Sequence, residues 1–204
     1  MYREMKSSQL LTIYELEEIF DNEHISLVDY DYFNHQGCLS DDSVIRLPLQ
    51  LKVEDLEIGF LEDKSFVIVV IQSGEAIIGL VEEGELSFHK VFRGYLVRKK
   101  QGKSQLKYLK TKGKSRAGSR VRLASTFNFL SEINQKLTEL MMDNEIERIV
   151  FHCSDLLNPH FFEGNSAFKK DDKRMISMKM NIETPSYEFL EKIVDRFLRA
   201  EFIS

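Results

Sequence analysis

The stretch Phe66-Val67-Ile68-Val69-Val70-Ile71 decides the fold of this chain. Its six consecutive apolar residues, five of them β-branched, are typical of a buried strand. Ser73-Gly74 follows as a tight turn, and Ala76–Val81 repeats the apolar pattern. Glu83-Gly84 then turns the chain into a third strand, which we expect over Leu86 to about Val97. These three strands predict a meander.

Helices and strands alternate after the meander. The expected elements are a helix over Val121 to about Met142, a strand over 146–151, a short helix over 158–162, a strand over 175–180 and a helix over Ser186 to about Glu201. The first helix has an apolar face made by Leu123, Phe127, Leu130, Ile133, Leu137, Leu140 and Met141. This order excludes a helical bundle, and a doubly wound parallel sheet would need helices between the first three strands. It predicts an α+β or α/β fold with a ribonuclease H-like mixed sheet, a three-strand meander followed by helix, strand, helix, strand and helix.

Residues 1–62 are expected to form a small N-terminal α+β annex, and 63–204 the main domain. The annex has a helical pattern over about 8–22, and Thr12 with Glu15 predicts a capping box if that helix starts late. Strand-like runs follow at 25–30 and 43–49.

Composition bounds the class of protein. With 204 residues, 43% of them hydrophobic, the chain has enough apolar surface for one sizeable core. The longest apolar run is too short to span a bilayer, and no signal-peptide core is visible, so we expect a cytoplasmic protein with no membrane partner. Cys38 and Cys153 are too few for a disulfide framework and are predicted to be free thiols.

The chain segregates its charge. No Asp or Glu lies between Glu85 and Glu132, whereas thirteen Lys and Arg do. The formal net charge of −5 is therefore the sum of about −18 outside this stretch and +13 inside it. Such segregation indicates a polyanionic partner, because each neutralised phosphate releases condensed counterions.

Other kinds of site fit the sequence poorly. A metal-dependent nuclease needs a carboxylate within the first strand, and Phe66–Gln72 has none. Gly102-Lys103-Ser104 and Gly113-Lys114-Ser115 resemble the end of a phosphate-binding P-loop but lack the glycine five residues upstream. The five histidines show no metal-ligand spacing, so no metal and no cofactor are predicted.

The basic loop, expected over 98–120, has two interpretations. Charge runs are usually solvated, mobile segments. Three details favour a function here: Gly102, Gly113 and Gly118 permit close backbone approach to a ligand, loops this long are usually functional or disordered, and Gln105 offers a neutral amide beside phosphates.

The same residues carry a resemblance to a known family. Arg98-Lys99-Lys100-Gln101-Gly102-Lys103-Ser104-Gln105, then Lys112-Gly113-Lys114, Ala117-Gly118-Ser119 and Arg122 at a helix start, resemble the release-factor-like domain of the ankyrin-repeat and zinc-finger peptidyl-tRNA hydrolases of ribosome quality control, of which bacterial stand-alone versions exist. That family is related to the middle domain of eukaryotic and archaeal class I release factors. The resemblance covers roughly 65–200. It departs from the family at Leu123, Ser125 and Thr126, where a second arginine and Asn-Glu are usual.

The resemblance implies a function and a set of site residues. The function is peptidyl-tRNA hydrolysis on stalled ribosomes, with large-subunit RNA and peptidyl-tRNA as partners and a monomer as the active form. Gln105 and Gly102 are the implied catalytic residues. The implied RNA-binding residues are Arg98, Lys99, Lys100, Lys103, Ser104, Lys107, Lys112, Lys114, Arg116, Arg120 and Arg122.

Three alternatives stay open at this point. The loop could anchor a non-catalytic ribosome- or tRNA-binding factor, or belong to an endonuclease that cuts tRNA near its 3′ end. It could also be a solvated segment of an acidic protein that does not bind RNA.

Overall fold

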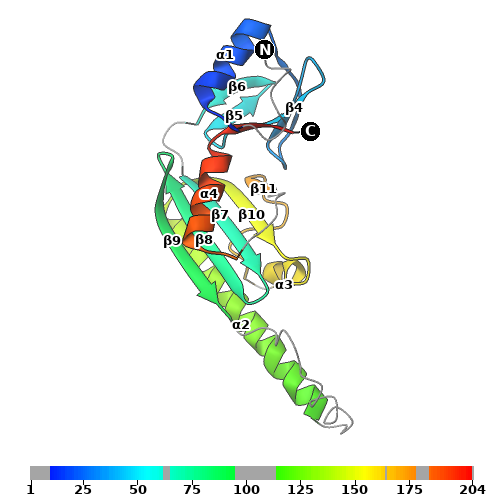
Figure 1. The fold of residues 1–204 in the computed structure, drawn as a ribbon. Coiled ribbons are helices and arrows are strands. Elements are labelled where there is room, and N and C mark those ends of the chain that lie inside the picture. The colour runs from blue at the N-terminus through cyan, green and yellow to red at the C-terminus, as the bar shows by residue number, and fades with distance from the viewer. Residues whose placement is uncertain (1–9, 62–64, 95–113, 164, 178–183, 204) are drawn as a thin grey trace.

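The computed structural model describes residues 10–61, 65–94, 114–163, 165–177 and 184–203, with backbone alone for 114–123. It has an α+β fold with two five-stranded sheets and a separate two-stranded ribbon. The sheets lie one above the other along a long axis, and helix α2 (Lys114–Asp143) extends from the lower one (Figure 1). None of the helices in the described ranges is long and apolar enough to cross a membrane.

The lower sheet contains the predicted meander. Strands β7 (Ser65–Gln72), β8 (Glu75–Glu82) and β9 (Glu85–Arg93) pair antiparallel in sequence. Strand β10 (Ile146–Cys153) then pairs parallel with β7, and β11 (Met175–Ser177) pairs parallel with β10. The order across the sheet is therefore β11-β10-β7-β8-β9, with the first predicted strand at its centre.

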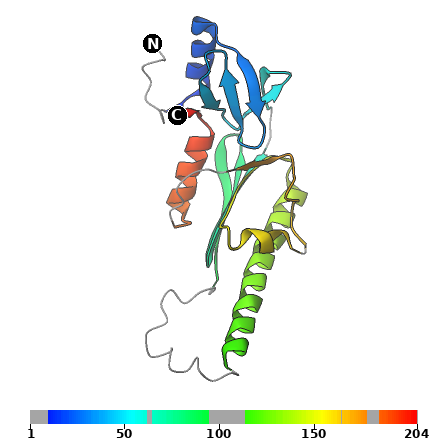
Figure 2. The same ribbon diagram turned by 90° about the vertical axis from the view of Figure 1, so that its right-hand side faces the viewer.

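Helices cover both faces of this sheet. The C-terminal half of α2 and the short helix α3 (Asn158–Phe162) pack on one face, and α4 (Tyr187–Phe197) packs on the other (Figures 1 and 2). Because both faces are covered, β7 is buried along its length, which explains its unbroken apolar run. Gly79 in β8 lets α4 approach closely, since a Cβ atom there would lie 2.7 Å from Leu190 Cδ2.

The upper sheet combines strands from the two ends of the described chain. Its order is β1-β12-β4-β3-β2, formed by β1 (Leu10–Leu11), β2 (Leu27–Asp31), β3 (Gln36–Leu39), β4 (Val44–Arg46) and β12 (Ala200–Ile203). Helix α1 (Ile13–Glu23) and the ribbon of β5 (Leu51–Glu54) and β6 (Glu57–Phe60) contribute apolar side chains to its core. The predicted boundary near residue 62 stays a prediction, and β12 is a strand from beyond it that pairs within the annex.

A buried ion network holds β12 in place. Arg46 and Glu201 are 5% and 4% exposed, and Arg46 Nη2 donates to Glu201 Oε2 at 3.0 Å. Arg196, at the end of α4, donates to both oxygens of the same carboxylate at 2.8 and 2.9 Å. The Arg46 guanidinium also lies 4.7 Å from the ring centre of Phe197. One carboxylate therefore joins β12, β4 and α4.

Several predicted elements differ from the observed ones. The predicted helix over 8–22 starts late, at Ile13, and its Thr12–Glu15 capping box is confirmed. The helix expected from Ser186 to about Glu201 ends at Phe197, because the chain then extends to pair with β1 and β4. Strands β3, β5 and β6 were not predicted, since each is only four residues long.

Among the side chains of α2 that the structure describes, from Ala124 onward, one position of the predicted apolar face is wrong. Phe127 is 41% exposed and meets the ring of His160, whereas Phe129 is 4% exposed and faces the sheet. The helix also starts at Lys114 instead of Val121, so residues 114–120 of the predicted loop are helical.

Candidate functional site

The basic segment connects the end of β9 to the start of α2. Its central part, 95–113, lies outside the described residues, and so do these predicted site residues: Arg98, Lys99, Lys100, Gly102, Lys103, Ser104, Gln105, Lys107 and Lys112. The remaining predicted RNA-binding residues, Lys114, Arg116, Arg120 and Arg122, lie in the first three turns of α2. The structure thus describes the supports on either side of the candidate site.

The support before the segment is a close backbone contact. The N–H of Gly94 donates to the carbonyl of Gly74 at 2.8 Å, which links the end of β9 to the β7–β8 turn. Gly74 has φ +86°, and a Cβ atom there would lie 2.7 Å from the Gly94 oxygen. A Cβ atom on Gly94 would lie 2.7 Å from Phe129 Cδ2. Gly94 is therefore held between the β7–β8 turn and α2, which fixes the position where the chain leaves β9.

The support after the segment is the second half of α2. The side chains of Phe129, Leu130, Ile133, Leu137 and Leu140 are buried against the sheet. Their spacing of three and four residues places them along one side of the helix. This half therefore fixes the direction in which the rest of α2 points.

A buried amide ties α2 to α3. Asn134 is 7% exposed, its Oδ1 accepts from the N–H of Ala167 at 3.0 Å, and its Nδ2 donates to the carbonyl of Phe161 at 3.3 Å. Both backbone groups are thereby satisfied without water. The amide is a positioning group for α3 and the chain that follows it.

The first half of α2 projects away from the sheet. The helix has 30 residues, so it is about 45 Å long. Among side chains described from Ala124 onward, Phe129 is the first buried one. Figures 1 and 2 show the N-terminal turns extending past the end of the sheet. We call residues 114–128 the basic projection, because they contain Lys114, Arg116, Arg120 and Arg122.

The sequence of the basic projection does not favour the helix itself. Its first turn has no acidic residue, although the partial positive charge of a helix N-terminus favours acids there. Gly118 lies within the helix, where glycine costs about 1 kcal/mol relative to alanine. A projection that keeps bases and a glycine at this cost suits a polyanion, because phosphates neutralise the bases.

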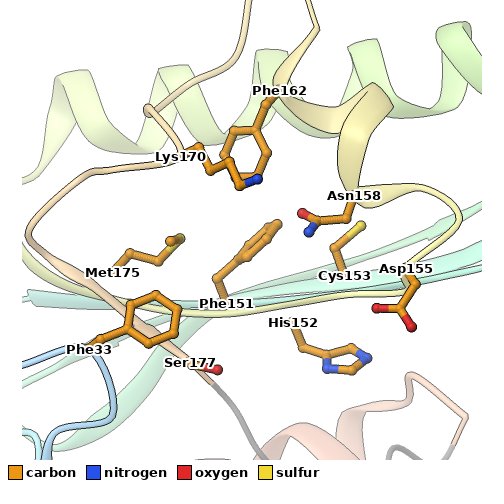
Figure 3. A pocket seen from close by; sticks show the side chains of 10 residues that line it. All are labelled: Phe33, Phe151, His152, Cys153, Asp155, Asn158, Phe162, Lys170, Met175 and Ser177. Carbon is orange, nitrogen blue, oxygen red and sulfur yellow. The ribbon is translucent and has the colours of Figure 1, made fainter. Parts of the chain in front are cut away.

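A separate hollow lies where β10 ends and α3 begins (Figure 3). Its volume is about 340 Å³, and Phe151, Cys153, Asn158 and Lys170 are among its lining residues. Burial raises the pKa of the Cys153 thiol to about 12, so this thiol is a poor nucleophile. His152 points to the opposite side of β10 in Figure 3. Although His152 also lines the hollow, its ring does not lie beside the Cys153 thiol in this view.

Metal chemistry finds no support in the described part of the chain. No group of three or more His, Cys, Asp or Glu side chains converges there as a metal site would require. Both cysteines are free, as predicted.

The sequence did not reveal the positioning residues. Gly74, Gly94 and Phe129 meet only in the folded state, and the last two are 35 positions apart. One signal existed for the glycine at the end of β9, since Gly94 breaks an otherwise strand-like run. Asn134 gave a second signal, as a polar residue one position from the buried Ile133 on the helix.

Comparisons with known proteins found one matching family model and 14 matching chains of solved structures. Residues 66–204 match the family model described as Bacteroidetes VLRF1 release factor, which is about two thirds of the chain. No curated protein sequence matched. A solved structure described as "Vms1 mitochondrial localization core" is similar, with a TM-score of 0.42 and 13% identity over 99% of this chain and 87% of that chain. The family match excludes β1–β6.

Proposed function

Because the chain belongs to the Bacteroidetes VLRF1 release factor family, we propose that it is a peptidyl-tRNA hydrolase that frees nascent chains on stalled ribosomes. The observation that carries this proposal is the position of Gly102–Gln105. This motif lies in a stretch without acids, between the fixed residue Gly94 and the basic projection. The proposed partners are large-subunit RNA and peptidyl-tRNA, and the proposed active form is a cytoplasmic monomer.

The fold supports the proposal. We propose that the lower sheet is of the ribonuclease H-like class, which is supported by its strand order β11-β10-β7-β8-β9, by β8 antiparallel to its neighbours and by helices on both faces. Because a fold hosts many functions, the basic segment and the family carry the functional argument.

The proposed mechanism works mainly by positioning. Arg98, Lys99, Lys100 and Lys103 bind phosphates of the tRNA acceptor end and ribosomal RNA, and the basic projection adds further phosphate contacts. The packed half of α2 and the contact at Gly94 fix the two described ends between which the segment lies, and we expect this to lower the entropy cost of placing the motif at the ester.

The proposed chemical step is ester hydrolysis. Water adds to the carbonyl carbon of the ester, the bond to the ribose oxygen of the terminal adenosine breaks, and that oxygen takes up a proton. Gln105 orients the water and donates to the developing oxyanion, and Gly102 provides the turn. The neighbouring RNA hydroxyl relays the proton.

The test is peptide release from purified stalled ribosome complexes that carry a nascent chain. Gln105→Ala should reduce release by about a hundredfold or more, as loss of one oxyanion donor does. Gln101→Ala is the matched control, because it removes a neighbouring amide outside the Gly-x-x-Gln motif. Both variants should sediment with ribosomes like the wild type.

The tRNA 3′ end distinguishes the alternatives in the same experiment. An intact CCA end after release supports ester hydrolysis, and a shortened end indicates tRNA cleavage. If wild type and Gln105→Ala both sediment with ribosomes and neither releases peptide, the protein is a binding factor and the hydrolase proposal is wrong.

A further inference from the structure

An exposed aromatic ring lies at the C-terminal end of the basic projection. Phe127 is 41% exposed, whereas Phe129, two positions later, is buried against the sheet. The Phe127 ring meets the ring of His160 on α3, with 5.7 Å between their centres and 73° between their planes. Such an edge-to-face contact covers one face of one of the two rings, so other ring faces stay open to a third ring.

This ring pair is held in place where α2 leaves the sheet. Figure 2 shows α3 beside α2 near the end of the sheet. Asn134 on α2 donates to the carbonyl of Phe161 at 3.3 Å, which fixes the backbone next to His160. Glu163 Oε2 accepts from Nδ1 of His160 at 2.9 Å and orients the imidazole. The pair is therefore preorganised, which reduces the cost of stacking a ligand on it.

Two arginine positions of the basic projection share the helix face of Phe127. Arg120 and Arg116 precede it by seven and eleven residues, which is close to two and three helical turns. These spacings place the three positions along one line of the helix, with the arginines about 10 Å and about 16 Å from Phe127. The sequence has no Asp or Glu between Glu85 and Glu132, so this line of α2 contains no acid. A phosphate backbone that follows the arginines therefore arrives at the Phe127 ring.

The charge beside the ring pair fits a nucleobase better than a phosphate. The carboxylate of Glu163 is exposed and would repel a phosphate placed at His160. A nucleobase is uncharged, so this carboxylate does not oppose it. The phosphates would instead lie at the arginine positions farther along the projection, and the ring pair would meet the neutral part of the nucleotide.

We propose that the Phe127–His160 pair stacks on an unpaired RNA nucleobase whose neighbouring phosphates bind Arg120 and Arg116. Unpaired nucleobases in RNA are commonly bound by stacking on aromatic side chains, whereas those within a duplex are already stacked on their neighbours. The ring pair thus adds a preference for unpaired RNA to phosphate contacts that have none. The inference rests on the RNA partner of the proposed function and does not involve ester hydrolysis.

RNA binding by the full chain tests the proposal, with a single-stranded RNA dodecamer and the duplex of the same sequence as probes. Phe127→Leu keeps an apolar side chain beside α3 but removes the ring, and it should weaken single-strand binding about tenfold without changing duplex binding. Phe127→Tyr keeps the ring and should bind within about twofold of the wild type. Tyr14→Leu is the matched control, because it removes an 83% exposed ring from α1 and should change neither affinity.

A direct optical measurement is possible because the chain contains no tryptophan. Phe127→Trp should retain RNA binding, and single-stranded RNA should quench its fluorescence because the indole stacks on a nucleobase. Inorganic polyphosphate has phosphates without nucleobases, so it should bind the basic projection without quenching. Tyr14→Trp places the same fluorophore on α1, at the other end of the molecule in Figure 1, and its emission should not respond to RNA.

Three outcomes would overturn the stacking site. The first is equal single-strand affinity of the wild type and Phe127→Leu, and the second is equal quenching by RNA and polyphosphate. The third is an equal loss of single-strand and duplex binding in Phe127→Leu with a lowered unfolding midpoint, which would show that Phe127 only braces α2 against α3. A wild type that binds neither RNA would overturn the RNA partner of the proposed function as well.

Discussion

The ion network of Arg46, Arg196 and Glu201 and the basic projection use charge in opposite ways. In the ion network, Arg46 on β4 and Arg196 at the end of α4 share the carboxylate of Glu201 on β12. In the projection, four bases follow one another in the first three turns of a helix without an acid. The first arrangement contains a carboxylate that pairs with both cations, and the first turns of α2 contain none.

This difference separates architecture from function. The Arg46 and Glu201 side chains are buried, so each would be costly without its partner, and their pairing specifies how β12 docks. The projection gains nothing from its own charges, because a helix N-terminus favours acids. The variants below alter either the core of the upper sheet or the projection, and they should affect different measurements.

The largest effect should come from Glu201→Leu. This change leaves the buried Arg46 guanidinium without its carboxylate, and breaking such a pair costs about 3–5 kcal/mol. Urea unfolding would measure it. Glu188→Leu, at an exposed position of α4, is the matched control and should cost less than about 1 kcal/mol. The double variant Arg46→Met with Glu201→Leu should regain much of the loss, and equal losses in single and double variants would contradict the ion-network account.

The next effect is acid destabilisation through His35. This imidazole is 1% exposed, Tyr30 Oη hydrogen-bonds its Nδ1, and its Nε2 donates to the carbonyl of Pro48 at 2.9 Å. Burial lowers the pKa of His35 to about 3, with Arg148 and Arg46 adding repulsion. The unfolded chain then binds a proton that the folded chain does not, so stability is full above pH 6.5 and falls as the pH drops toward 3.

Between pH 7 and pH 5 the free energy of unfolding should fall by about 2 kcal/mol. Urea unfolding at each pH would measure this change. His35→Gln keeps a donor for the Pro48 carbonyl but has no titrating group, so its stability should change less over the same range. Parallel profiles for the two proteins would show that another group controls the acid response.

A smaller effect is expected when the basic projection loses its charge. Replacing Lys114, Arg116, Arg120 and Arg122 with Gln should weaken RNA binding roughly tenfold and lower the slope of log affinity against log salt by up to about 3. Unfolding should not change. The control set replaces bases elsewhere, Lys52, Lys169, Lys192 and Arg199, and should leave the salt slope as it is. An equal fall of the salt slope in both sets of variants would mean that net charge alone drives RNA binding.

The smallest effect should come from Gly118→Ala. Alanine favours the helix by up to about 1 kcal/mol. Because the described contacts of α2 with the sheet begin at Phe129, the gain should appear as slower amide hydrogen exchange within 114–128 and not in global unfolding. A raised unfolding midpoint with unchanged exchange would show that the projection and the sheet are coupled.

Much of the lower sheet was predictable from the sequence, because its strands are long and apolar and their turns contain glycine at positive φ. Phe66–Ile71, the turn at Gly74 and the short helix at Asn158 were found at their observed positions. The capping box at Thr12 was also found, since it is a local pattern.

The upper sheet was harder to predict for a physical reason. The segment Ala200–Ile203 continues the helical pattern of α4, and its Glu201 looks like a solvent-facing residue. Its partner Arg46 is 155 positions away, so only the folded chain reveals the pairing. At the candidate site, the sequence identified the bases and the Gly-x-x-Gln motif. The contact of Gly94 with Gly74 and Phe129 joins residues far apart in the sequence, so no local pattern predicts it.

The place of β12 also has a consequence for synthesis. Strands β1 to β4 are translated first, yet β12 lies between β1 and β4 and is translated after every other strand of the structure. The meander needs only local contacts and can form earlier. The upper sheet, whose first strands are translated before the lower sheet, can therefore be completed only after the lower sheet has been translated. Until then β1 and β4 expose unpaired edges, which makes the growing chain most prone to aggregation just before its last strand is added.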